Sequence, residues 1–296
     1  MLAISHFVVQ ILTFSYIRQC SAAKSGTFDL LTYNIAGLPS FLEDNGIPGD
    51  KSTNAGSIGA KFAQYGYDVI HVQEDFAYHS DLYKTDNHPF RTGTSGNVPF
   101  GSGLNTLSKY NWNTFDRVTW DTCFLNMADC LTPKGFTFMR LGLPGDVQVD
   151  LYNLHSDAGD DQGDKDARRA DDNQLLSYIK ANSVGRAVVI AGDMNDRYTE
   201  SGRSIDILIN AGFKDSWIEL AKGGVEPVEG SNNIDCNIPA GTNNCEDVDK
   251  IFYRSGDSVS LSALDYRHES TKFEQSNGDR LSDHNPILVE FAWSAA

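Results

Sequence analysis

The chain has 296 residues, of which 40% are hydrophobic and 11% aromatic, so it carries enough apolar side chain for a large core and is unlike a disordered chain. Its 24 basic and 40 acidic residues give a formal charge of −16. A strongly acidic surface repels a phosphate polymer, which argues against a tight nucleic-acid binder. A nuclease is still compatible with this charge, because bound divalent cations can reverse the local field.

The N-terminal segment differs from the rest of the chain. Residues 2–17 are mostly apolar and are followed by the small residues of Cys20-Ser21-Ala22-Ala23. This pattern predicts a signal peptide over residues 1–23, followed by one catalytic domain over residues 24–296. A buried strand and a membrane anchor are the alternatives, although the apolar run is short for a spanning helix. We therefore expect a secreted, extracellular monomer without stable membrane insertion.

Four cysteines remain after the predicted signal peptide, and four cysteines allow three pairings. The pairs Cys123–Cys130 and Cys236–Cys245 are the simplest, because each closes a short loop in a turn-rich segment, and export favours oxidation. No Cys-x-x-Cys pair or Cys/His cluster in the sequence indicates a zinc site.

Strand-like and helix-like segments alternate from Phe28 to the C-terminus. Hydropathy and turn residues predict strands at 28–34, 68–73, 101–107, 135–141, 147–153, 187–191, 248–253, 258–264 and 286–291, and helices at 58–65, 168–181 and 204–210. The Gly/Asn/Pro-rich stretch 223–244 is predicted to be a surface loop held by Cys236–Cys245. Two packed, mainly antiparallel β-sheets flanked by helices would bury these apolar runs, so we expect an α/β four-layer sandwich.

Polar signatures follow or begin six of the predicted strands, where loops build sites on a rigid scaffold. They are Asn34 in TYNIAG, Glu74 in HVQED, His155 in YNLHSD, Asp193 and Asn195 in AGDMND, Asp249 in EDVDKIF, and Asp283 with His284 in LSDHNP. Each alone is more often a turn or capping residue. Together they supply oxygen ligands for Mg²⁺ and histidines for proton transfer, which is the set that phosphate-ester cleavage needs.

The order of these signatures, from Phe28 to Phe291, resembles the endonuclease/exonuclease/phosphatase superfamily. That superfamily includes deoxyribonuclease I-like nucleases, inositol polyphosphate 5-phosphatases and neutral sphingomyelinases. The resemblance implies that Glu74 and Asn34 bind Mg²⁺ while Asp283 faces the metal. It further implies that His284 is the general base and that Asp249 orients it.

The same resemblance assigns Asp193 and Asn195 to holding the nucleophile and the transition-state phosphoryl group, and His155 to the phosphate. Deoxyribonucleases of this type pair the His155 counterpart with a glutamate from a middle strand, and the corresponding GSGLNTLSKY segment has no acid. We therefore expect His155 to bind phosphate rather than to donate a proton.

Within the superfamily, GLNTLSKYNW, CLTPKGFTFMRL and HSDAG resemble secreted sphingomyelinases, although the polar stretch from Tyr253 to Asp283 lacks the exposed aromatic hairpin of the bacterial enzymes. The expected function is a secreted, metal-dependent phosphodiesterase of the sphingomyelinase-type phospholipase C class, acting on a phospholipid head group. The alternatives are an extracellular deoxyribonuclease I-like endonuclease, a phosphomonoesterase on a small ester, and a non-catalytic binding protein. The insert with His79, His88, Arg91 and TGTSGN is either an anion-binding loop or a surface turn.

Overall fold

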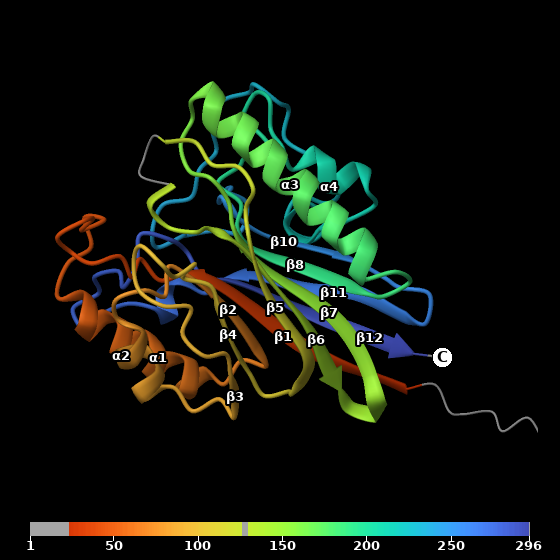
Figure 1. Ribbon diagram of the computed structural model, residues 1–296, viewed down its shortest axis with the longest axis horizontal. Coiled ribbons are helices and arrows are strands. Elements are labelled where there is room, and N and C mark those ends of the chain that lie inside the picture. The colour runs from red at the N-terminus through yellow and green to blue at the C-terminus, as the bar shows by residue number, and fades with distance from the viewer. Residues whose placement is uncertain (1–23, 126–129, 296) are drawn as a thin grey trace, which may run out of the picture.

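The computed structural model describes residues 24–125 and 130–295, so the predicted signal peptide lies outside the described residues. Two β-sheets pack face to face, and helices cover both outer faces (Figure 1). This is the predicted four-layer α/β sandwich.

Each sheet has six strands. The first contains, in spatial order, β11 (Val259–His268), β12 (Ile287–Ala295), β1 (Lys24–Asn34), β2 (Val69–Gln73), β4 (Asn105–Ser108) and β3 (Phe90–Arg91). The second contains β5 (Trp112–Thr119), β6 (Gly135–Leu143), β7 (Val147–His155), β8 (Val188–Asp193), β10 (Asp249–Arg254) and β9 (Lys214–Asp215). Only β1–β2 and β7–β8 pair in parallel among these strands, and the prediction of mainly antiparallel sheets is confirmed.

Two of the three predicted helices, α1 (Lys51–Tyr65) and α3 (Gln162–Asn182), begin earlier than their apolar patterns predict, whereas α4 (Asp206–Asn210) begins two residues later. The first sheet is covered by α1 and α2 (His79–Thr85), and the second by α3 and α4 (Figure 1). The short α5 (Ser216–Leu220) packs against β10 and β11, and two 3-10 turns lie at Pro144–Asp146 and Ser270–Lys272. Asp50 caps α1 by accepting from the Thr53 amide at 2.8 Å, and a capping box starts α3. Both caps add a polar first turn that hydropathy does not reveal.

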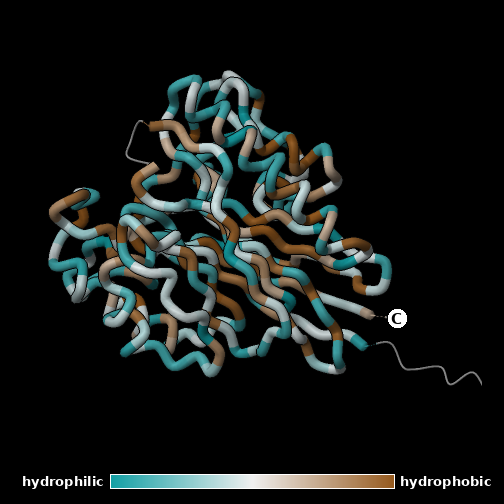
Figure 2. Tube along the Cα trace, viewed as in Figure 1, coloured by the Kyte–Doolittle hydropathy of each residue, from teal (hydrophilic) through white to brown (hydrophobic). Residues whose placement is uncertain are grey.

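Alternating side chains of β1 fill two cores. Phe28 and Leu30 point into the core between the sheets, whereas Leu31 and Tyr33 pack with Phe62 beneath α1. Burying one large apolar side chain contributes about 1.5–3 kcal/mol, so this two-sided burial fixes the strand in place. Hydrophobic stretches run along the central strands (Figure 2).

The structure differs from the prediction at one predicted strand and contains an additional long strand. The predicted strand 101–107 starts only at Asn105, because Gly103 has a φ of 69° and its carbonyl accepts the Asp75 amide. Strand β5 was not predicted, since as an edge strand it is half-buried on both faces and shows no clear alternation.

Both predicted disulfides, Cys123–Cys130 and Cys236–Cys245, are present. The stretch 223–244 is a loop without regular helix or strand, as predicted. Across residues 24–125 and 130–295, no helix combines the length and apolar character needed to cross a membrane.

Candidate active site

The polar signatures meet at one end of the two sheets. Asn34 ends β1, and Glu74 follows directly on β2. In the second sheet, Asp193 at the end of β8 is in register with His155 on β7 and with Asp249 on β10. Because neighbours in register point to the same face of a sheet, these three side chains lie together.

His284 and Asp249 form a hydrogen-bonded pair that joins the two sheets. His284 lies just before β12, and its Nδ1 is 2.7 Å from Asp249 Oδ2. Its Nε2 points toward Asp193, whose Oδ2 is 3.7 Å away. Burial alone would lower the pKa of His284, but the charges of Asp249 and Asp193 raise that pKa well above its usual value. The bond to Asp249 fixes the orientation of the imidazole, and the raised pKa makes it a strong base once it has lost its own proton.

Asn34 connects the two groups of acids. Its Nδ2 donates to Glu74 Oε1 at 3.0 Å and to Asp193 Oδ2 at 3.0 Å, while its Oδ1 accepts the Ala36 amide at 3.0 Å. If the side-chain amide rotated, Oδ1 would take the place of Nδ2 next to Glu74, where it could serve as a ligand of a cation. Asn34 thus sits where the resemblance places a metal ligand, beside Glu74.

The backbone holds Glu74 in an unusual conformation. Its φ is 55°, in the left-handed region that non-glycine residues rarely adopt. Gly37 packs against this turn so closely that a Cβ there would lie 2.2 Å from the Glu74 carbonyl oxygen. Glycine at position 37 therefore allows the turn that directs the Glu74 side chain into the site.

The acids around Glu74 suit a divalent cation. Glu74 Oε2 is buried and has no hydrogen-bond partner within the described part of the chain. Burial and then the charge of Asp283 raise the pKa of Glu74, although the hydrogen bond from Asn34 opposes this. A cation with oxygen ligands would satisfy the orphaned oxygen and offset the repulsion. Glu74, Asp283 and Asn34 are the residues that would hold it.

His155 lies on the opposite side of Asp193 from His284. Its Nε2 is 3.4 Å from Asp193 Oδ2, and its buried Nδ1 has no hydrogen-bond partner among residues 24–125 and 130–295. Burial and the charge of Lys134 lower the pKa of His155 to about 3, so its imidazole is neutral. A neutral imidazole can hydrogen-bond to a phosphate oxygen but is a poor proton reservoir.

Asn195 completes the turn after β8. It has a φ of 50°, its amide donates to Asp193 Oδ1 at 3.0 Å, and its Nδ2 donates to the Ser156 carbonyl at 3.1 Å. Asp193 itself stays ionised: burial would raise its pKa, but His284, His155 and Lys134 together hold that pKa below its usual value. The turn therefore fixes a carboxylate at the centre of the site.

Three residues of the site region were not predicted from the sequence. Lys134 donates to the Ser156 carbonyl at 3.1 Å and supplies positive charge next to His155; the only signal for it was its place in CLTPKGFTFMRL. Lys51 is buried at the start of α1 and donates to Asn45 Oδ1 at 2.6 Å, and Asn45 donates to Asp283 Oδ2 at 2.6 Å. Both contacts are tertiary and leave no pattern in the sequence.

The insert after Glu74 has a structural role. His88 is buried between Asp86 Oδ1 at 2.6 Å and the Tyr67 carbonyl at 2.8 Å. Arg91 donates to the Tyr83 carbonyl at 2.7 Å and lies over the Tyr83 ring. His79 contacts Asp75 at 2.7 Å. The TGTSGN segment that follows is an irregular, partly exposed loop whose first residue, Thr92, is buried.

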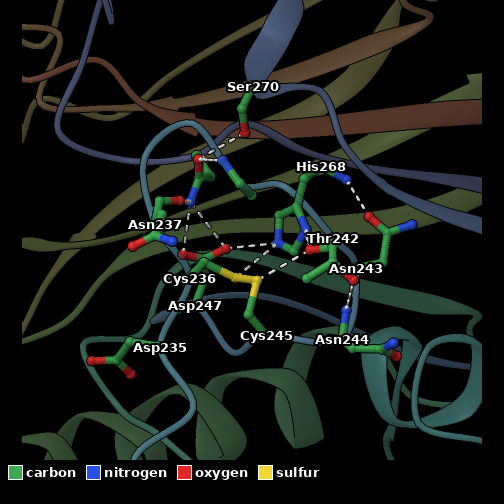
Figure 3. Close-up of a disulfide and its surroundings, with 12 residues drawn as sticks. Asp235, Cys236, Asn237, Thr242, Asn243, Asn244, Cys245, Asp247, His268 and Ser270 are labelled. Carbon is green, nitrogen blue, oxygen red and sulfur yellow. Dashed lines mark hydrogen bonds and ion pairs between the residues drawn. A yellow bond between two sulfur atoms is a disulfide. The ribbon is translucent and has the colours of Figure 1, made fainter.

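The second disulfide, Cys236–Cys245, lies beside His268 and Asp247 (Figure 3). His268 Nε2 lies 2.7 Å from Asp247 Oδ2 and 3.8 Å from Cys236 Sγ. Asp247 in turn accepts from Asn285 Nδ2 at 3.1 Å, and Asn285 is the neighbour of His284. These contacts connect the Cys236–Cys245 loop to Asn285, and so to the backbone next to His284.

Comparison with known proteins identifies the family of the chain. A family model described as "Endonuclease/Exonuclease/phosphatase family 2" matches residues 52–236. A curated relative from Mycobacterium tuberculosis, named "Sphingomyelinase", is 40% identical over 279 residues, which are 92% of this chain and 54% of the relative. The chain therefore spans about half the length of the curated relatives it matches.

Solved structures share the fold at lower sequence identity. A beta toxin variant from Staphylococcus aureus with bound magnesium ions has a TM-score of 0.61 and 16% identity, covering 89% of this chain and 99% of the toxin. TDP2 from D. rerio, complexed with a single strand DNA product, has a TM-score of 0.65 and 18% identity, covering 90% of this chain and 98% of TDP2. From its family match and from the fold, the chain belongs to the endonuclease/exonuclease/phosphatase family.

Proposed function

We propose that this chain is a secreted, divalent-metal-dependent phosphodiesterase of the phospholipase C type, which cleaves the ester between phosphocholine and the lipid alcohol of a sphingomyelin-type lipid. One observation carries the proposal: the His284–Asp249 pair, the ionised Asp193 and the orphaned Glu74 oxygen converge at one end of the sandwich. A proton acceptor, a place for a nucleophile and a cation ligand are what hydrolysis of a phosphate diester requires.

In this mechanism His284 Nε2 takes the proton from the attacking water, while Asp249 holds Nδ1 and stabilises the imidazolium that forms. The water oxygen bonds to phosphorus, the bond from phosphorus to the lipid oxygen breaks, and the lipid alkoxide takes up a proton from solvent and leaves as the alcohol. Asp193 and Asn195 position the water and the phosphoryl group. The neutral His155 hydrogen-bonds to a phosphate oxygen. When bound by Glu74, Asp283 and Asn34, Mg²⁺ supplies positive charge that polarises the phosphoryl oxygen.

The lipid substrate is proposed from similarity and from charge. The curated relative that is 40% identical across 92% of this chain is named a sphingomyelinase. The formal charge of −16 disfavours a polyanionic substrate. We also propose that residues 1–23 are removed on export, because two disulfides suit an oxidising compartment. N-terminal sequencing of secreted protein should then start near Lys24.

A nuclease is the second candidate. The fold of TDP2, solved with a DNA product, supports it. The residues assigned to proton transfer and metal binding serve either phosphodiester, so they do not separate the two substrates.

A parallel assay of purified protein tests the proposal. Sphingomyelin, lysophospholipid, duplex DNA and RNA are each incubated with Mg²⁺ and, as a control, with excess EDTA. We expect phosphocholine release from sphingomyelin, its loss in EDTA and its return with added Mg²⁺. DNA degradation without lipid cleavage would favour the nuclease, and full activity in EDTA would remove the metal from the mechanism.

A further inference from the structure

Several large apolar side chains are exposed to solvent near the candidate active site. Phe41 is 85% exposed, Phe100 84% and Leu125 83%. Leu131 is 58% exposed and Leu42 50%. Single exposed apolar residues are common, but several gathered around one site indicate an interaction surface. We call these five residues the apolar rim.

The rim is carried by three loops: residues 38–45, residues 92–104, and the described residues 120–125 and 130–134 around Cys123 and Cys130. Each loop contacts the site by a hydrogen bond. Asn45 of the first loop bonds to Asp283, and Gly103 of the second accepts the amide of Asp75, the neighbour of Glu74. On the third loop, Trp120 donates to the His155 carbonyl at 2.8 Å. The three loops therefore border the site on different sides.

The second and third loops also adjoin each other. Pro99, the neighbour of Phe100, lines an open pocket of about 280 Å³ together with Cys123, Cys130 and Lys134. In Figure 1 the loop between β1 and α1 and the segments around Cys123 and Cys130 lie at the same end of the sandwich, to the left. Figure 2 shows hydrophobic positions on both.

We propose that the apolar rim inserts reversibly into the outer leaflet of a zwitterionic lipid bilayer and so brings the site to the lipid head groups. This inference rests on the proposed function and adds how the enzyme reaches its substrate. The rim residues themselves touch no reacting atom.

The arrangement of the rim favours a lipid surface over a protein partner. Its exposed side chains come from loops that are far apart in the sequence, and a deformable lipid surface can accept such side chains without matching their shape. Charge favours a zwitterionic surface. Exposed Glu43 and Asp44 follow directly on Phe41 and Leu42, and the whole chain is acidic, so an anionic membrane would repel it.

The size of the effect follows from apolar burial. Moving one Phe or Leu side chain from water into an apolar phase is worth roughly tenfold in an equilibrium constant. Replacing three rim residues should therefore weaken vesicle binding by at least about a hundredfold, even if each inserts only in part.

The test compares Phe41→Ser/Leu42→Ser/Phe100→Ser with a control, Val184→Ser/Leu264→Ser. The control residues are also exposed, Val184 at 77% and Leu264 at 51%. Val184 precedes β8, whose far end carries Asp193, and Leu264 lies within the edge strand β11. The control therefore removes exposed apolar area away from the rim.

Binding is measured by co-sedimentation with sphingomyelin/phosphatidylcholine vesicles in EDTA, which suppresses metal-dependent turnover. Turnover is measured with Mg²⁺ on the same vesicles and on the water-soluble p-nitrophenyl ester of phosphocholine. We expect the rim variant to lose vesicle binding and vesicle turnover but to keep turnover of the soluble ester. The control variant should match the unaltered protein in all three.

Two outcomes would overturn the inference: a rim variant that binds vesicles like the unaltered protein, or one that loses soluble-ester turnover to the same degree as vesicle turnover. Tighter binding to vesicles that contain phosphatidylserine would overturn the choice of a zwitterionic surface. If the unaltered protein binds vesicles through the rim but cleaves neither ester, the rim stands and the proposed function fails.

Discussion

Replacing His284 by alanine, alone and together with Asp249→Asn, separates an effect on catalysis from an effect on stability. The substitution removes the proposed proton acceptor, so turnover should fall by ~10²–10⁴-fold, the usual effect of losing a general base. That loss corresponds to about 2.7–5.5 kcal/mol of transition-state stabilisation. Additional Mg²⁺ should not restore the activity, because the missing function is proton transfer.

His284→Ala should also destabilise the fold, through Asp249. The Oδ1 atom of Asp249 is buried and lacks a partner within the described residues, and its Oδ2 would lose the 2.7 Å contact with His284. Leaving a buried acceptor unsatisfied costs about 1–3 kcal/mol, which lowers the melting temperature by a few degrees in a chain of this size. Adding Asp249→Asn removes the buried charge, so His284→Ala/Asp249→Asn should regain much of that stability.

Turnover and melting temperature are measured side by side for the unaltered protein, the single variant and the double variant. We expect the melting temperature to fall and then recover, while turnover falls and stays low. Near-normal turnover in a folded His284→Ala protein would refute the role of His284. Recovery of turnover together with stability in the double variant would show that the pair is structural.

Three other changes test separate parts of the structure. Glu74→Gln keeps the shape but removes a ligand charge, so activity at low Mg²⁺ should fall by at least about tenfold and recover in part at high Mg²⁺; a loss that Mg²⁺ does not relieve would argue against a ligand role. Cys236→Ser/Cys245→Ser opens a short loop, which should lower the free energy of unfolding by about 2–3 kcal/mol in urea titrations, and an unchanged midpoint would contradict this. Burial and the charge of Asp172 raise the pKa of Asp171 from 3.8 to about 8, so folding favours its protonated form. The free energy of unfolding should therefore decline as pH rises from 3.8 toward 8. Over that interval the melting temperature of Asp171→Asn, relative to that of the unaltered protein, should increase. If the two plots of melting temperature against pH run parallel, Asp171 does not titrate in this way.

The sequence predicts the central strands well because they are buried on both sides. β1, β2, β7 and β8 are largely buried, and a polar residue of the site ends or directly follows each of them. Edge strand β5 is not buried in this way, since water reaches much of it. Helix starts were predicted late because the first turns of α1 and α3 are polar and are fixed by capping, which hydropathy does not detect.

Sequence patterns also predict only some of the residues of the site. Its residues could be predicted where a polar side chain follows a buried strand, as for Asp193. Lys51 and Asn45 reach Asp283 only through the folded loop between β1 and α1, and Lys134 reaches the site across the second sheet. Phe41 and Phe100 are likewise far apart in sequence and are brought to the same site by the fold alone. Such contacts exist only in three dimensions.

The His284–Asp249 pair joins the two layers of the sandwich, since His284 precedes β12 of one sheet and Asp249 begins β10 of the other. The distance between His284, the proposed proton acceptor, and Asp249 is therefore set by how the interior between the two sheets packs. Close-packed interiors transmit small displacements, and catalysis is sensitive to errors of about an ångström. Core substitutions far from the chemistry, or mild heating, should consequently inactivate the enzyme before circular dichroism registers any loss of strand, which makes turnover the more sensitive gauge of sheet-to-sheet alignment.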